Sequence, residues 1–201
     1  MASNRTRRTF ITALPAAASL LMLPGPVMAL NVDEARRMVD KLVAAVNAVI
    51  SSGQSEASMF KSFEAIFVRF ADVRYIAQSS LGPAGRRATS AQMSAYVKAF
   101  QGYISRKYGR RFREFIGGRI EVTGARPLKS FYEVTSIAVL KGQSPFEVRW
   151  HVFDKSGKDL FFNIIIEGVN MLAAERTEIG AMLDQRRGDI SRLTNDLKTM
   201  G

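Results

Sequence analysis

The feature that most constrains the fold is residues 146–172, where two apolar stretches flank a glycine-containing turn. Residues 154–157 (Asp-Lys-Ser-Gly) predict a type I turn closed by Gly157 in the left-handed conformation, which sets the register of a hairpin. In that register Asp154 pairs with Lys158. Outward from it the pairs are Val152 with Leu160, Trp150 with Phe162, Val148 with Ile164, and Phe146 with Ile166.

Side chains alternate between the two faces of a strand, so these eight apolar residues share one face of the hairpin. The other face is mixed. It receives Glu147, Arg149, His151 and Asn163 together with Phe153, Phe161 and Ile165.

Helical periodicity dominates the chain before this hairpin. The spacing of apolar residues predicts helices over residues 32–50, 56–70 (with Ser55 as N-cap), 73–80 (with Asp72 as N-cap) and 90–115, the last opened by a capping box of Thr89 and Gln92. Residues 85–87 are expected to form a loop. The aromatic stripe of the second helix indicates either core packing or contact with a ligand.

After the long helix, alternation predicts strands over residues 120–126 and 131–140, followed by the hairpin and by terminal helices over 171–187 and 189–200. About four strands with short connections predict a curved antiparallel sheet with helices against one side. The fold class is therefore α+β.

The first 29 residues have the pattern of an export signal. Arg7 and Arg8 form a twin-arginine signature, a short apolar run follows, and small residues precede a cleavage site after Ala29. The run is too short and too rich in proline for a membrane span, which needs roughly 20 apolar residues. The pattern predicts a periplasmic protein.

Removing the signal lowers the net charge from +11 to +8, so the mature chain is still strongly basic. In the periplasm this charge favours anionic lipid or protein partners over nucleic acid. A cluster of cations on the long helix indicates either a solvated face or a weak contact site for a lipid headgroup or a partner. Its candidates for such contact are Arg106, Lys107, Arg110 and Arg111.

The residue inventory argues against most catalytic and metal sites. His151 is the only histidine and there is no cysteine, so the common metal clusters are excluded and no cofactor is expected. A serine triad would have to use His151, which lies in mid-strand without a nucleophile-elbow motif.

The sequence feature left to explain is the large number of aromatic residues. Thirteen phenylalanines, five tyrosines and one tryptophan exceed what a two-layer fold of this size needs. A cavity between sheet and helices, rimmed by cations, is the shape expected of a lipid carrier.

Several motifs resemble one family over the whole mature chain. They are residues 166–171 (Ile-Glu-Gly-Val-Asn-Met), 178–180, Gly188-Asp189-Ile190, Asp72-Val73, Leu81-Gly82, and the spacing from Phe100 to Tyr108. In order and spacing these resemble the MlaC / toluene-tolerance family of periplasmic lipid shuttles. Asn170 stands where many members have serine.

The resemblance implies an NTF2-like sheet joined to a helical subdomain. Residues 30–201 would form one lipid-binding domain, helical over 31–116, with the sheet over 119–167 and terminal helices over 171–200. It also implies a carrier, expected to be a monomer, that moves phospholipid between an outer-membrane lipoprotein complex and an inner-membrane ABC transporter with an MCE-domain subunit. Related members of hopanoid pathways make a hopanoid-type lipid a second possible cargo.

On this hypothesis the protein is not an enzyme. The residues predicted to contact the acyl chains are Phe100, Tyr103, Tyr132, Val148, Trp150, Val152, Phe162, Ile164 and Ile166. Two alternatives stay open: an NTF2-like module that only binds proteins, and a lipid-acting enzyme dependent on His151.

Overall fold

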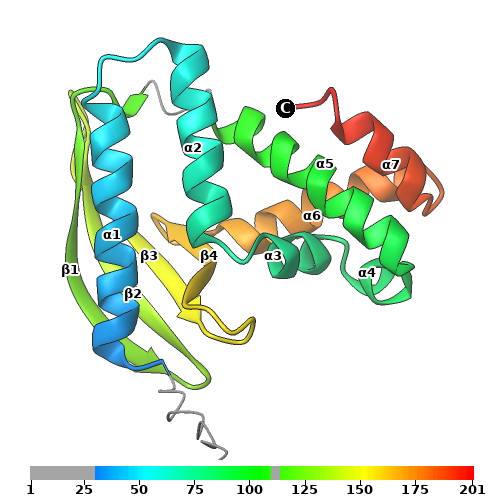
Figure 1. The fold of residues 1–201 in the computed structure, drawn as a ribbon, viewed down its shortest axis with the longest axis horizontal. Coiled ribbons are helices and arrows are strands. Elements are labelled where there is room, and N and C mark those ends of the chain that lie inside the picture. The colour runs from blue at the N-terminus through cyan, green and yellow to red at the C-terminus, as the bar shows by residue number, and fades with distance from the viewer. Residues whose placement is uncertain (1–29, 110–113) are drawn as a thin grey trace, which may run out of the picture.

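The computed structural model describes residues 30–109 and 114–201, which form seven helices and one five-stranded sheet (Figure 1). The predicted export signal lies outside the described residues. The α+β class is confirmed, and a short fifth strand adds to the four predicted ones. The sheet is an antiparallel meander in the order β1-β2-β3-β4-β5, built from β1 (Arg119–Leu128), β2 (Phe131–Val139), β3 (Phe146–Phe153), β4 (Leu160–Ile166) and β5 (Val169–Asn170).

The first helix, α1 (Val32–Ile50), lies along one face of the curved sheet (Figure 1). Its capping box joins Asn31 and Glu34, and its buried stripe packs on β1 and β2. Asn47 ties the helix to the sheet edge, because its side-chain amide donates to the Ile120 carbonyl (2.9 Å) and accepts from the Ile120 N–H (3.0 Å).

The other helices gather beside α1 and beyond β4 (Figure 1). The predicted caps Ser55 and Asp72 are confirmed, as is the capping box of Thr89 with Gln92. Asp189 caps the last helix. Asn170 caps the helix that begins at Met171, because its side chain accepts a hydrogen bond from the Ala173 N–H. Serine is equally suited to this capping role. These helices are α2 (Glu56–Phe70), α3 (Val73–Ser80), α4 (Pro83–Arg87), α5 (Ser90–Gly109), α6 (Met171–Gln185) and α7 (Ile190–Leu197).

One short segment has a different structure from the one predicted. Residues 85–87 belong to helix α4 rather than a loop, because Pro83 begins a single helical turn. The described part of α5 ends at Gly109, whose Cα lies so near Phe60 of α2 that an added Cβ would approach that ring within 2.9 Å.

The predicted hairpin register is wrong by two residues. Val148 pairs with Ile166 and Trp150 with Ile164, whereas the tight turn required Ile164 and Phe162 as partners. The turn itself forms, since the Gly157 N–H donates to the Asp154 carbonyl (2.8 Å). Residues 154–159 nevertheless all lie in the connection, because strand pairing begins only between Phe153 and Leu160.

A β-bulge between His151 and Val152 exchanges the faces of two phenylalanines. The Phe161 ring packs on Trp150 (5.6 Å between centroids), although alternation placed it on the mixed face. The Phe162 ring packs on Phe153 (4.5 Å), although alternation placed it on the apolar face. A bulge inserts one residue, so the alternation shifts by one beyond it.

Candidate functional site

An apolar cavity of about 530 Å³ lies between the sheet and the helices. This volume falls within the roughly 300–1,000 Å³ typical of ligand pockets. The helices contribute most of one wall, and β3 and β4 contribute the other. Apolar lining residues include Leu42, Val46, Phe63, Ile66, Phe67, Ile76, Ile104, Phe115, Val148, Trp150, Phe161, Ile164, Ile166 and Leu172.

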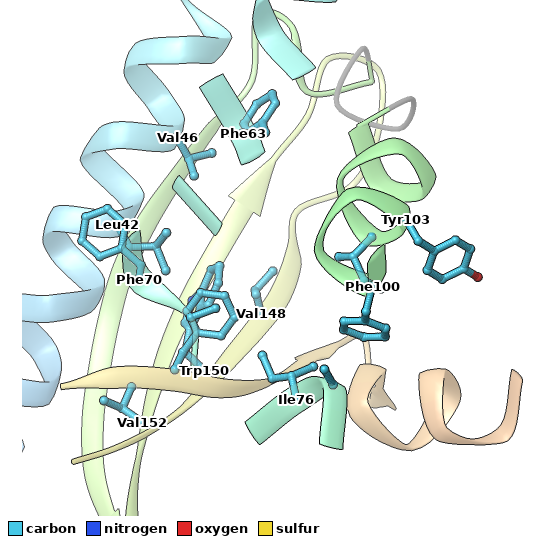
Figure 2. Packing of buried hydrophobic residues seen from close by; sticks show 14 of the residues in the cluster. Leu42, Val46, Phe63, Phe70, Ile76, Phe100, Tyr103, Val148, Trp150 and Val152 are labelled. Carbon is cyan, nitrogen blue, oxygen red and sulfur yellow. The ribbon is translucent and has the colours of Figure 1, made fainter. Parts of the chain in front are cut away.

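The strand wall belongs to the core face, by which we mean the sheet face that carries Val134, Ser136, Val148 and Trp150 (Figure 2). Its polar atoms are satisfied within the sheet. The Trp150 Nε1–H donates to the Ser136 hydroxyl (2.7 Å), which donates to the Val148 carbonyl (3.2 Å). This wall therefore offers a ligand mainly hydrocarbon and aromatic surface.

Five of the nine predicted lipid-contact residues line this cavity: Val148, Trp150, Phe162, Ile164 and Ile166. The pairing of β3 with β4 and the alternation of side chains outside the bulge bring Val148, Trp150, Ile164 and Ile166 together. Phe162 also belongs to the lining, although its ring packs on Phe153. The part of the cavity lining that β3 and β4 supply could thus be predicted from the sequence.

The other four predicted residues lie outside the cavity lining. Phe100 is fully buried, and Tyr103 projects from α5 to donate to Glu178 (2.6 Å; Figure 2). Val152 is fully buried near the bulge, and Tyr132 borders a smaller pocket at the hairpin end.

The cations proposed for headgroup contact are used within the protein where the structure describes them. Arg106 donates to the carbonyls of Leu197 (2.6 Å) and Met200 (2.9 Å) and so caps the end of α7. Lys107 bridges two carboxylates of α6. Arg110 and Arg111 lie outside the described residues.

The residues of the helices that line the cavity were not among the predicted contact residues. Their signal was the aromatic stripe of α2, of which Phe63 and Phe67 line the cavity. A second signal was Glu175, an acid at an apolar position of α6, which also lines the cavity and is only 4% exposed.

Glu175 belongs to a polar cluster between α5 and α6. Lys107 Nζ donates to Glu175 Oε1 (2.7 Å) and to Glu178 Oε2 (2.5 Å), and the Tyr108 hydroxyl donates to Glu175 Oε1. Burial tends to raise the pKa of Glu178, but hydrogen bonds from Lys107 and Tyr103 bring it below the ordinary value. Burial and the bond to Glu178 raise the pKa of Tyr103.

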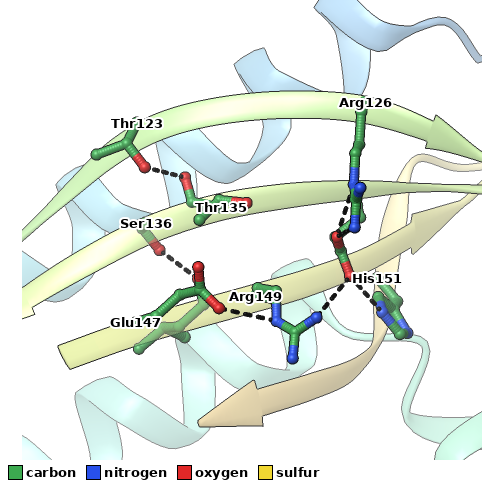
Figure 3. Close-up of polar contacts among 9 residues, drawn as sticks. Thr123, Arg126, Thr135, Ser136, Glu147, Arg149 and His151 are labelled. Carbon is green, nitrogen blue, oxygen red and sulfur yellow. Dashed lines mark hydrogen bonds and ion pairs between the residues drawn. The ribbon is translucent and has the colours of Figure 1, made fainter. Parts of the chain in front are cut away.

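The outer face, which carries Glu133, Arg149 and His151, is organised by charge (Figure 3). Glu133 is 2% exposed and accepts from Arg126 Nη2 (2.6 Å), while Arg149 Nη1 lies 3.5 Å from it. Burial would raise the pKa of Glu133, but Arg126, His151 and Arg149 lower it overall.

His151 is held neutral on this face. Asn163 Oδ1 accepts from the Leu172 N–H (3.0 Å), so Asn163 Nδ2 faces and donates to His151 Nδ1 (3.3 Å). The proton of the neutral ring is then on Nε2, which donates to Glu133 (3.2 Å). Burial lowers the pKa of His151. The hydrogen bond to Glu133 and its charge raise the pKa, but burial together with the charge of Arg149 keeps it below the ordinary value.

Within residues 30–109 and 114–201, no helix is long and apolar enough to cross a bilayer. The same residues contain no group of three or more acids and histidines arranged to hold a metal ion.

The family model for the MlaC protein matches residues 36–199. The chain belongs to the MlaC family. A solved structure with this fold is a phospholipid-binding protein from Ralstonia solanacearum in complex with a phospholipid. It is 19% identical, has a TM-score of 0.70, and the match covers 81% of this chain and 94% of that one. The MlaC resemblance and the fold inferred from it are confirmed.

Proposed function

We propose that this MlaC-family chain is a periplasmic carrier that holds the acyl chains of a phospholipid in the cavity. The observation that carries the proposal is the cavity itself, about 530 Å³ and lined mainly by apolar side chains. Each methylene moved from water into such a site contributes about 0.8 kcal/mol. Shape and burial can therefore hold a lipid without many polar contacts.

The phospholipid bound by the Ralstonia solanacearum protein supports this class of cargo. In the full proposal the carrier serves an Mla-type ABC transport system and exchanges lipid with an MCE-domain complex in the inner membrane and a lipoprotein complex in the outer membrane. A hopanoid-type lipid is the second candidate cargo.

Export by the twin-arginine signal is part of the proposal. Cleavage after Ala29 would make Leu30 the first residue, and its backbone nitrogen lies 3.2 Å from Asp154 Oδ2. The new ammonium group would thus meet a carboxylate, which favours a chain end at this position.

The position of His151 supports a role without catalysis. Both ring nitrogens are engaged on the outer face, and the residue is not part of the cavity lining. A His151→Ala variant should therefore carry lipid as the wild type does, and loss of a turnover activity in it would revive the enzyme alternative.

Native mass spectrometry of the mature protein purified from its own periplasm, with lipid extraction, tests the proposal. We expect stoichiometric lipid, and the extract names the class as phospholipid or hopanoid. Protein that is bare and also takes up no added phospholipid would favour the protein-binding alternative.

A further inference from the structure

Leu30, the residue before the N-cap of α1, is held by both its side chain and its backbone. The side chain is 7% exposed and packs in the hydrophobic core. The backbone N–H donates to Asp154 Oδ2 (3.2 Å), which belongs to the connection between β3 and β4. The next N–H, that of Asn31, donates to Glu34 Oε2 (3.0 Å). Two consecutive nitrogens before α1 therefore each face a carboxylate.

The carboxylates at this point repel one another. Burial raises the pKa of Asp159, the charges of Glu34 and Asp154 raise it further, and the charge of Lys41 opposes them only in part. We call Glu34, Asp154 and Asp159 the three-acid group. In the part of the chain that the structure describes, none of its members forms an ion pair with a lysine or an arginine.

Cleavage of the export signal changes the chemistry of the Leu30 nitrogen. In the precursor this nitrogen belongs to a neutral peptide bond and has one N–H. Hydrolysis of the bond between Ala29 and Leu30 consumes one water molecule and leaves a carboxylate on Ala29 and an ammonium group, with three N–H donors, on Leu30. The free end would thus bring a positive charge and two more donors to the three-acid group.

Two effects oppose a cation at this place. The dipole of α1 has its positive end here. Lys129 borders the same small pocket as Leu30 and Asp154. Lys129 lies beyond ion-pair distance of Asp154, however, whereas the Leu30 nitrogen is 3.2 Å from that carboxylate. The direct contact with the carboxylate therefore determines the sign of the effect.

We propose that the three-acid group is the binding site for the new amino terminus of this chain, so that cleavage fastens the start of α1 to the connection between β3 and β4. The proposal rests on the export and cleavage proposed above and adds to them an effect on the folded domain. The mature chain should be more stable than a chain in which other residues precede Leu30.

Two chains test this, one of residues 30–201 and one of residues 27–201, in which three residues of the signal displace the charge. Each is made as a fusion whose leader a protease removes. Urea denaturation at pH 7 should give a folding equilibrium constant roughly three- to fivefold larger for residues 30–201, as for a partly exposed ion pair. Asp154→Asn should remove most of this difference. Asp184→Asn, which changes an exposed acid of α6, is the matched control and should keep it.

The amine itself gives a second measurement. Its pKa, followed by NMR of protein labelled with ¹³C-leucine, should lie above the ordinary value of about 8 for an α-amino group, because the carboxylates stabilise the charged form. Asp154→Asn should lower it toward that value. Extra residues that destabilise the longer chain by crowding alone would leave the pKa of the amine in residues 30–201 ordinary.

Equal stabilities of the two chains, or an ordinary pKa of the amine, would overturn the proposal and leave the carrier function standing. A stability difference that Asp154→Asn leaves in full would also overturn it. The lipid in the native mass spectrum tests the carrier function separately. The same spectrum gives the mass of the periplasmic protein, and a chain that starts at another residue would refute both the cleavage after Ala29 and this proposal.

Discussion

The two faces of the same strands are stabilised in opposite ways. On the core face Val148 and Trp150 present apolar surface toward the helices and border a cavity. On the outer face the alternate residues Arg149 and His151 join Glu133 in a charged network that leaves the acid 2% exposed. Consecutive residues of β3 therefore lie in different environments, one face bordering the cavity and the other held by ion pairs and hydrogen bonds.

Both faces are joined at Asn163. Its amide donates to His151 on the outer face and accepts from the Leu172 N–H at the start of α6, next to residues that line the cavity. A second link is the Phe162 ring, which lies 5.8 Å from the His151 ring and lines the cavity. Variants on each face can measure how separately the two faces act.

The largest effect is expected from a charge on the core face. Trp150→Asp, with Val148→Asp as companion, should abolish lipid co-purification, because it places an unpaired carboxylate in the apolar wall. Lipid extraction of the purified variants measures this. Glu147→Ala, an exposed neighbour on β3, is the control and should keep its lipid; equal losses in all three would show that the faces do not differ in this way.

Removing the central acid of the outer face should act on stability and leave binding intact. Glu133→Gln weakens its interactions with Arg126, Arg149 and His151 and should lower the free energy of unfolding by about 2 kcal/mol. Urea denaturation measures the change. A drop in lipid affinity of the folded variant would contradict the separation of the two faces.

A smaller loss is expected for the buried hydroxyl of the core face. Ser136→Ala removes the acceptor of the Trp150 indole N–H and should cost about 1–2 kcal/mol. Thr123→Ala, which removes a hydroxyl that donates to the Thr135 carbonyl at the exposed edge, should cost less than about 0.5 kcal/mol. Denaturation of both variants compares them, and similar costs would show that burial of the hydroxyl is unimportant.

The smallest effect is a pH dependence of the outer face. The pKa of His151 is lower in the folded protein than its ordinary 6.5, so the folded state binds fewer protons and stability should fall as pH drops below about 6.5. The pKa of Glu133 is also lowered, and its contribution should be lost below about pH 4.5. Melting temperatures at constant ionic strength measure both steps.

His151→Gln should flatten the upper step and leave the lower one. An imidazolium would present an Nδ1–H to the donating amide of Asn163, so protonation should also loosen the start of α6. An increase in the stability of the wild type when the pH is lowered from 7 to 5 would refute this account.

Much of the fold was predictable because its signals are local. The caps Ser55 and Asp72 and the box of Thr89 with Gln92 join residues about three apart, and all are confirmed. Alternation likewise placed Val148 and Trp150 on the apolar side, and five of the predicted contact residues do line the cavity.

The register of β3 with β4, and the sheet faces on which Phe161 and Phe162 lie, could not be predicted from such local signals. A glycine turn indicates the tightest hairpin, but Asp154 is also an acceptor for the Leu30 N–H, 124 residues away in sequence. The bulge at Val152 then exchanged Phe161 and Phe162, and no pattern in the two strands alone marks the inserted residue. Similarly, Lys107 was expected at the surface, but its partners Glu175 and Glu178 are 68 and 71 residues further along.

By itself, therefore, the sequence determined the elements, their caps and the apolar character of one sheet face, because these depend on neighbours within a few residues. Only the tertiary structure decided the strand register, the helical wall of the cavity and the contacts of Lys107 with Glu175 and Glu178. These depend on how closely distant segments approach, which is set by packing over the whole core.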